Sequence, residues 1–313
     1  MFVLGAGASA PYGFPLGPLL AERVCRSIEQ RHTGLHQLLC GHFDAQAVDA
    51  FPQEFRRSGQ YSLDSFVERR PEFREIVKTA IIYTLAPSEN EPALLAPPRT
   101  NTNDVPVGTP DGIDRDWYRY LLRQIVTTRP EDFGANRLKV ITFNFDRSFE
   151  RRLFVSLKST YNLSDVETEK LTQAVPILHI HGDLGAPAWL PSCAEDPEGR
   201  PYHADKFETI ATTHARRLSL IDDEIPNERR SSAREWLIGA KVVCFLGFSY
   251  HPLNLARLHI GSLSEPTIRG TARSMSTGEI GAVRREFHNK ANVSFFPNYD
   301  SLLFLRETEY VHQ

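Results

Sequence analysis

Phe2-Val3-Leu4-Gly5-Ala6-Gly7-Ala8-Ser9-Ala10 is the stretch that decides the fold of this chain. Three apolar residues form a short strand that breaks at Gly5, and the pattern G-x-G-x-x-A follows directly. Gly5 permits the tight turn, Gly7 lets the backbone approach a pyrophosphate, and a following helix offers free N–H groups at its N-terminus. The stretch is therefore typical of a dinucleotide-binding turn, although a plain strand–helix turn can carry the same residues.

The residues after this turn differ from those of an ordinary dehydrogenase. Such an enzyme places an acidic residue for the ribose at the end of the next strand, about 20 residues further on. Here that stretch reads Ala21-Glu22-Arg23-Val24-Cys25 and lies within an expected helix from Pro18 to about Gln30. The sequence therefore argues against a standard NAD oxidoreductase.

Further along the chain, short apolar runs alternate with helical patterns. We expect strands at Leu138–Phe143, Val175–Ile180, Lys241–Leu246 and Val293–Phe296. We expect helices at Ser62–Leu85, Asp114–Thr128 and Asp146–Leu157, and one that opens with the capping-box pattern Ser232-Ala233-Arg234-Glu235. Six prolines make Ala86–Gly112 an expected loop. Short apolar strands separated by helices predict an α/β, Rossmann-like parallel sheet with helices on both faces.

The composition is that of a globular protein with room for one large domain. The chain has 313 residues, of which 41% are hydrophobic, and its formal net charge is −3. We expect a single domain over residues 1–313, with a mainly helical insertion at about 40–130. The balance of charge is not basic, so direct nucleic-acid binding is not expected. Since no apolar run approaches the ~20 residues of a spanning helix, we expect a cytoplasmic protein without a membrane contact.

Cysteine and histidine spacing gives little support for a metal site. The cysteines are Cys25, Cys40, Cys193 and Cys244, and no two of them share a CxxC spacing. His179 and His181, at i and i+2, would share one face of a strand and could bind a metal. No third ligand is evident beside them, so we expect no metal.

Polar or glycine-bearing turns follow three further expected strands. Asn144 and Asp146 follow the second strand, at the edge where open α/β sheets bind ligands. Singly, Asp146 is read more simply as a helix N-cap and Asn144 as a turn residue. His181 follows the third strand and is a candidate acid–base group. Gly247 and Ser249 follow the fourth; glycine permits a close approach to a ligand, and serine can hydrogen-bond it.

Taken together, the four turns resemble those of the sirtuin-related family. The family's phosphate loop matches Gly5-Ala6-Gly7-Ala8-Ser9 with Gly13-Phe14-Pro15, and its later motifs match Asn144-Phe145-Asp146, His181-Gly182 and Gly247-Phe248-Ser249. The resemblance covers nearly the whole chain, from Leu4 to about Asn254. The bacterial sirtuin-like group that acts in antiphage defence has the most similar motifs, and Tyr61–Phe66 also resembles that group. The four-cysteine zinc module of protein-deacylating sirtuins has no counterpart, since residues 182–230 contain only Cys193.

The resemblance implies an NAD glycohydrolase that releases nicotinamide and ADP-ribose and depletes NAD. It implies that Asn144 orients the attacking water or the ribose hydroxyls and that His181 accepts a proton. Asp146 would hold the carboxamide or cap its helix. The NAD-binding residues it implies are Gly5, Ala6, Gly7 and Ser9 for the pyrophosphate, Asp146, and Gly247 with Ser249 on the adenosine side. An NAD-dependent protein deacylase and a non-catalytic NAD- or ADP-ribose-binding module are the alternatives.

Control of such an activity is expected to come from assembly. A homo-oligomer, or a partner defence protein such as an ATPase or an Argonaute-like protein, would restrain an enzyme that destroys NAD. The candidate switch segments are Ala86–Gly112 and Gly182–Arg230, because long loops often serve as lids or binding surfaces. Arg115, Arg119 and Arg123 form an expected basic stripe that is either a solvated face or a docking face.

Overall fold

The structure is a computed structural model of the chain. It describes residues 1–31, 33–96, 115–189, 199–202, 207–221, 223–263, 266–288, 290 and 292–308. Cys193 and residues 97–112 of the expected loop lie outside the described residues.

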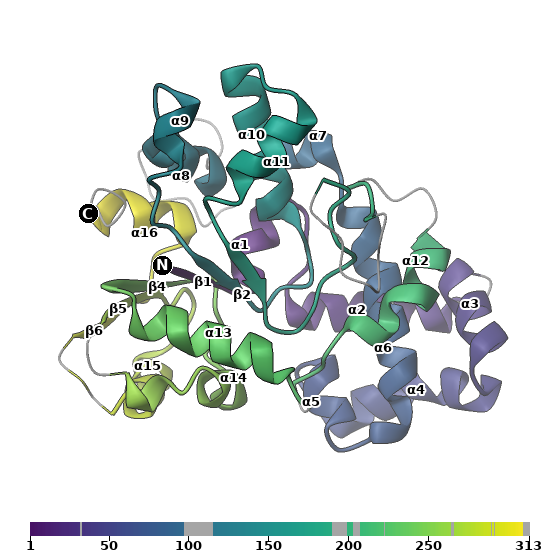
Figure 1. Cartoon of the computed structure of the whole chain (residues 1–313). Helices are drawn as coiled ribbons and strands as arrows, with labels where there is room; N and C mark the ends of the chain where they lie inside the picture. Colours follow the sequence, from purple (N-terminus) through teal and green to yellow (C-terminus); the bar gives the residue numbers. More distant parts are fainter. Residues whose placement is uncertain are drawn as a thin grey trace, which may run out of the picture.

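A six-stranded, all-parallel sheet forms the centre of the molecule (Figure 1). Its strands are β1 (Phe2–Leu4), β2 (Val140–Thr142), β3 (Ile177–His179), β4 (Val242–Leu246), β5 (Thr267–Thr271) and β6 (Val293–Phe296). They lie in the order β3-β2-β1-β4-β5-β6, and each neighbouring pair is parallel. This arrangement confirms the predicted Rossmann-like α/β fold. Strand β5 was not predicted, because Thr-Ile-Arg-Gly-Thr holds only one strongly apolar side chain.

Both faces of the sheet are buried, as parallel strands require. Phe2 and Leu4 of β1 pack into one hydrophobic cluster, whereas Val3 packs into a second cluster, because successive side chains of a strand point to opposite faces. The first cluster includes residues of α8 (Trp117–Ile125), α10 (Ser148–Tyr161) and α16 (Ser301–Thr308). The second includes residues of α13 (Asn227–Ile238), α14 (Pro252–Arg257) and α15 (Thr277–Glu286). Figure 1 shows these two helical layers on either side of the strands.

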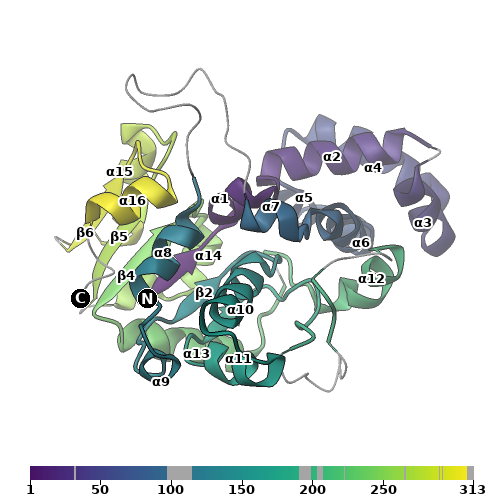
Figure 2. The ribbon, with the colours of Figure 1, turned by 90° about the horizontal axis from the view of Figure 1, so that it is seen from above.

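A group of helices lies beside the sheet rather than on one of its faces (Figure 2). It comprises α2 (Gly17–Glu29), α3 (Gly34–His42), α4 (Ala45–Ser58), α5 (Leu63–Val67), α6 (Arg74–Leu85) and α12 (Phe207–His214). The remaining helices of the described residues are α1 (Ala6–Ser9), α7 (Glu91–Leu95), α9 (Pro130–Phe133) and α11 (Asp165–Thr172). Helix α6 packs against α2 and α12. Within the described ranges, no helix has both the length and the apolar character needed to cross a membrane.

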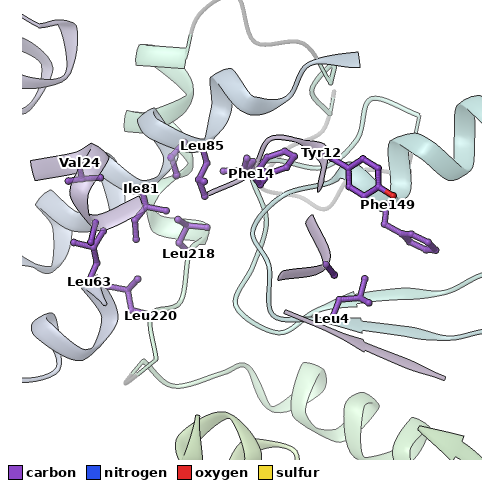
Figure 3. Close-up of a cluster of buried hydrophobic side chains, with 14 of the residues drawn as sticks. Leu4, Tyr12, Phe14, Val24, Leu63, Ile81, Leu85, Phe149, Leu218 and Leu220 are labelled. Carbon is purple, nitrogen blue, oxygen red and sulfur yellow. The ribbon is translucent and has the colours of Figure 1, made fainter. Parts of the chain in front are cut away.

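The apolar core runs without interruption from these helices to the sheet (Figure 3). Val24 of α2, Ile81 of α6 and Leu218 belong to the same buried cluster as Leu4 of β1 and Phe149 of α10. The helical segment and the sheet therefore share one core, and burial of apolar surface favours their association.

Three expectations about the helices need correction. The expected helix Ser62–Leu85 is divided at Pro71, where a 3-10 turn spans Pro71–Phe73, because proline cannot donate an intrahelical hydrogen bond. The expected loop from Ala86 begins instead with a 3-10 turn and helix α7, since Pro92 stands in the first turn, where proline is tolerated. Helix α13 begins at Asn227, so Ser232 lies inside it and does not cap it.

A buried group of charges joins three distant parts of the chain. Glu89, which follows the 3-10 turn Ala86–Ser88, accepts two hydrogen bonds of 2.8 Å from Arg147 and a further ion pair from Arg200. The side chains of Glu89 and Arg147 have no exposed surface. Arg147 also donates to the carbonyl oxygens of Gly185 and Pro201 at 3.1 and 3.0 Å. The single carboxylate therefore holds the segment after β3 against the start of α10.

Replacing Glu89 by Gln should destabilise the protein severely, by about 3–5 kcal/mol, because two buried guanidinium groups would lose their counter-charge. Urea-induced unfolding followed by circular dichroism measures the change. Glu91→Gln is the matched control, because its pair with Arg151 is partly exposed, with side chains 36% and 22% accessible, and should cost at most about 1 kcal/mol. Equal effects of the two substitutions would contradict this role of Glu89.

Candidate functional site

The predicted site residues all follow the carboxyl ends of adjacent strands. The turn Gly5–Ser9 follows β1, Asn144 and Asp146 follow β2, His181 follows β3, and Gly247 and Ser249 follow β4. Strand β1 lies between β2 and β4. The order of the strands therefore reverses at β1, and the connections that leave β1 and β4 run over opposite faces of the sheet. Ligands of open α/β sheets bind in the crevice at such a point.

The turns after β1 and β4 touch through their backbones. The Gly7 amide donates to the Gly247 carbonyl oxygen at 2.9 Å, and the Gly5 amide donates to the Leu246 carbonyl oxygen at 3.0 Å. A Cβ on Gly5 or Gly7 would lie 2.7 or 2.8 Å from Gly247 backbone atoms. Gly247 itself has a φ of +58°, and a Cβ there would overlap the Ala8 amide nitrogen. Glycine is thus required at these positions because two turns pack together, which is a different reason from approach to a pyrophosphate.

This packing limits the donors that the first turn offers. The amides of Gly5 and Gly7 are already engaged, and the Ala8 amide donates to the Gly5 carbonyl oxygen at 2.9 Å. Ala6 is exposed and is the first residue of α1, so its amide has no acceptor within the helix. Helix α1 has four residues and is followed by a 3-10 turn. The longer helix predicted from Pro18 to about Gln30 is confirmed as α2, Gly17–Glu29. The Ala6 amide is therefore the available donor of this turn.

Asn144 connects the turns after β1 and β2. Its Nδ2 donates to the carbonyl oxygen of Gly5 and to the Ser9 Oγ, both at 2.9 Å, and the residue is 8% exposed. Both amide hydrogens are thereby used. Its Oδ1 receives no hydrogen bond from the described residues, so this oxygen is the group that Asn144 can offer to a ligand.

Asp146 lies in the same buried network. Its Oδ1 accepts hydrogen bonds from the backbone amide and the hydroxyl of Ser148, and the Ser9 hydroxyl also bonds its carboxyl group. Burial raises the pKa of Asp146 above its ordinary value, although the bonds from Ser148 and Ser9 act in the opposite direction. Tyr118 of α8 joins the network through the Ser148 hydroxyl at 2.8 Å. Helix α10 begins at Ser148, two residues later than predicted, with Asp146 satisfying its first amide.

His179 and His181 do not share a face, so the predicted pair is wrong. Strand β3 ends at His179, and the alternation of side chains ends with it. The Nδ1 of His179 lies 2.9 Å from the Asn144 carbonyl oxygen, and its Nε2 bonds Glu150. His181 contacts Asn254 instead. No group of three potential metal ligands occurs in the described part of the chain.

The two histidines differ in their charge at neutral pH. Burial alone would lower the pKa of His179, but the Glu150 carboxylate outweighs it and raises the pKa to about 9. His179 is therefore a cation at neutral pH and fixes the backbone of Asn144. Burial, and secondly the charge of Arg257, lower the pKa of His181 to about 4. His181 is therefore neutral at pH 7.

His181 occupies a closely packed position and is 5% exposed. Its Nε2 lies 3.2 Å from the Asn254 Oδ1, and its ring packs against Phe143 with centroids 5.3 Å apart. The Arg257 Nη1 lies 3.4 Å from both ring nitrogens. A neutral imidazole in this position can accept a proton. Ser249, in the turn after β4, is exposed and suited to contact with a ligand.

The sequence did not indicate several residues of this edge. Glu150, Asn254 and Arg257 were not predicted. Asn254 and Arg257, three positions apart on α14, share a helix face, and that spacing after Gly247 was the available signal. Glu150 gave no signal, because an acidic residue early in a helix is ordinary.

The basic stripe is only partly helical, because α8 begins at Trp117 and Arg115 precedes it. Arg115 lies 3.9 Å from Asp300, and Arg119 lies 3.8 Å from Asp116. These carboxylates offset part of the positive charge. The docking role therefore stays a prediction.

The strand order and the strand-end turns together define a Rossmann-like α/β protein. Comparison with models of known protein families gives no match, and comparison with curated protein sequences gives none either. The family assignment therefore stays a prediction from the sequence motifs.

Gly247→Ala should destabilise the protein by at least about 2 kcal/mol, because alanine is strained at positive φ and its Cβ would overlap Ala8. Thermal unfolding at a fixed scan rate measures the effect. Gly239→Ala is the control, since its φ is −77° and its Cβ would make an ordinary 3.5 Å contact. A Gly247→Ala variant as stable as the control would show that the two turns do not pack in this way.

Stability should fall as the pH rises through the pKa of His179. Because that pKa is raised in the folded state to about 9, its stabilising contribution is complete below pH ~6.5 and is lost by pH ~9. The loss is at most about 3 kcal/mol. Glu150→Gln should flatten the profile of unfolding free energy against pH between 6.5 and 9, whereas the exposed Glu131→Gln should leave it unchanged. Profiles of equal slope for wild type and Glu150→Gln would refute the assignment.

Proposed function

We propose that this protein binds NAD at the carboxyl edge of β1, β2 and β4 and hydrolyses it to nicotinamide and ADP-ribose, as a sirtuin-like enzyme. The observation that carries the proposal is the pair of hydrogen bonds that joins Asn144 to the glycine turn, with His181 after the next strand of the sheet. Asn144 links the turns after β1 and β2, and a neutral imidazole follows the adjacent β3. The four-turn sequence pattern supports the same function.

Each part of the edge has a role in this proposal. The exposed Ala6 amide faces the pyrophosphate, with Gly5, Gly7 and Ser9 shaping the turn beneath it. Ser249, also exposed, contacts the adenosine side, next to Gly247. Asp146 serves the nicotinamide carboxamide, in addition to holding the first amide of α10. These assignments use NAD as a substrate and require no metal.

The reaction breaks the bond between the ribose C1′ and the nicotinamide nitrogen and forms a bond from C1′ to a water oxygen. Nicotinamide leaves with the bonding electron pair, which neutralises its positive ring, and the ribose passes through an oxocarbenium-like state. The Asn144 Oδ1 accepts a hydrogen bond from the water or a ribose hydroxyl, since its Nδ2 is occupied. His181 accepts the proton that the water loses and passes it to solvent.

A second function has a specific observation in its favour. His181 is 5% exposed and its pKa of about 4 makes it a weak base at neutral pH. A module that binds NAD or ADP-ribose without cleaving it needs no base. Binding without turnover would therefore favour this alternative, in which the protein acts as a sensor that controls a partner.

The biological setting that we propose is depletion of NAD in antiphage defence, with activity released by assembly. The NAD assay should therefore be run across a size-exclusion profile and with proteins encoded alongside this one. Activity confined to an oligomer or complex supports restraint by assembly. Full, concentration-independent turnover by a monomer contradicts it.

Incubation of the pure protein with NAD should release equal amounts of nicotinamide and ADP-ribose without any acylated peptide, as measured by chromatography. His181→Ala and Asn144→Ala should each lower the rate at least about 100-fold, the contribution typical of a general base or a positioned polar group. His42→Ala is the control, because His42 lies on α3, away from the strand ends, and its Nδ1 bonds the Leu38 carbonyl oxygen of the same helix.

The outcomes separate the candidates. A strict need for an acylated peptide would identify a deacylase, and tight NAD binding with no product in any assembly state would identify the binding module. Asn144→Ala also removes two buried hydrogen bonds, so its unfolding free energy is measured beside its rate. Wild-type turnover by His181→Ala would show that the base is misassigned.

A further inference from the structure

Arg257 of α14 stands between His181 and a loop that precedes α13. Its Nη1 lies 3.4 Å from both the Nδ1 and the Nε2 of His181. A nitrogen at equal distance from both would collide with Cε1 if it lay in the ring plane, so it lies over the face of the imidazole. Its Nη2 donates to the Asp223 carbonyl oxygen at 2.7 Å. The guanidinium thus joins the ring of His181 to the backbone at Asp223.

Asp223 is in turn held by the helical segment. Its Oδ2 lies 2.8 Å from the Lys78 Nζ, and its other oxygen pairs with Arg74. Lys78 and Arg74 both belong to α6. The side chains of Lys78 and Asp223 are 10% and 16% exposed, so this pair is poorly screened by solvent. The Leu220 amide also donates to the Asp223 Oδ2, at 2.9 Å.

We propose that Arg257 is a positioning residue for His181, and that α6 sets the placement of Arg257 through Asp223. The chain of contacts runs from Lys78 to Asp223, from the Asp223 carbonyl oxygen to Arg257, and from Arg257 to the imidazole. The helical segment thereby regulates the group that we assign as the base. The inference that α6 regulates a catalytic base rests on the proposed function, whereas the contacts themselves do not.

The groups around the buried His181 act in both directions on its protonation. The Asn254 Oδ1 faces the Nε2, and the Ser219 backbone also hydrogen-bonds the ring; both contacts raise the pKa of His181. Arg257, over the ring face, acts in the opposite direction and opposes protonation. The charged and titratable groups nearest to His181 are Arg257, which lowers its pKa, and Asp223, which raises it. His251, at the start of α14, also experiences the charge of Arg257.

The test measures the pKa of His181 by NMR in protein labelled at histidine, without NAD, the signal being the one absent from His181→Ala. Arg257→Gln should raise that pKa from about 4 by at least about one unit, because a neighbouring like charge is removed. Arg257→Lys should retain most of the depression, because the charge remains. Arg230→Gln is the control, since Arg230 donates to the Ile225 carbonyl oxygen and has no contact with His181.

The link to α6 is tested by combining variants. Lys78→Met should raise the pKa of His181 in the wild-type background and have no further effect in the Arg257→Gln background. A direct electrostatic effect of Lys78 would be equal in both. Lys158→Met, which breaks a surface pair with Asp165, is the control. If Lys78→Met fails to fold, as judged by circular dichroism, Arg74→Met replaces it, because Arg74 holds the other oxygen of Asp223.

Two results would overturn the proposal. One is an unchanged pKa of His181 in folded Arg257→Gln, and the other is an equal shift by Lys78→Met in both backgrounds. Where NAD is cleaved, the acidic limb of the pH profile of kcat/KM should move upward in Arg257→Gln together with the NMR value. Where NAD is not cleaved in any form, the proposed function fails, while the NMR results still decide whether α6 controls His181.

Discussion

The contact between the turns after β1 and β4 is the constraint on which the rest of this edge depends. Gly7 donates its amide to the Gly247 carbonyl oxygen at 2.9 Å, and neither turn has space for a Cβ. With these two turns in contact, Ala6 is exposed, and Asn144 hydrogen-bonds both Gly5 and Ser9. The glycines of the G-x-G-x-x-A pattern are therefore required for packing within the protein, and a ligand that binds there meets a turn that is already formed.

Buried charge organises the surroundings of this edge. Glu89 neutralises Arg147 and Arg200 beneath the segment after β3, and Glu150 holds His179 as a cation beside the Asn144 backbone. Buried ion pairs contribute little net stability compared with apolar packing, but the loss of one partner is costly. Here Glu89 joins the start of α10 to the segment that carries Arg200, and Glu150 holds the His179 ring beside the Asn144 carbonyl oxygen.

The sheet and the placement of the candidate residues after its strand ends were predictable, because both depend on local patterns. Short apolar runs identified five of the six strands, and each polar turn followed directly from a strand end. The sixth strand, β5, was missed because its pairing with β4 and β6, and not its composition, makes it a strand. The break at Pro71 follows a local rule, whereas the early start of α13 left no comparable signal.

By itself, the sequence determined the α/β class, the turn of Gly5–Ser9 and the positions of Asn144 and His181 at strand ends. The tertiary structure decided what these groups can do. His179 and His181 are two positions apart, yet one lies beside Glu150 and is charged, and the other lies under Arg257 and is neutral. The physical reason is that a pKa, like the choice of a hydrogen-bond partner, depends on groups brought near by folding, and these lie tens of residues away in the sequence.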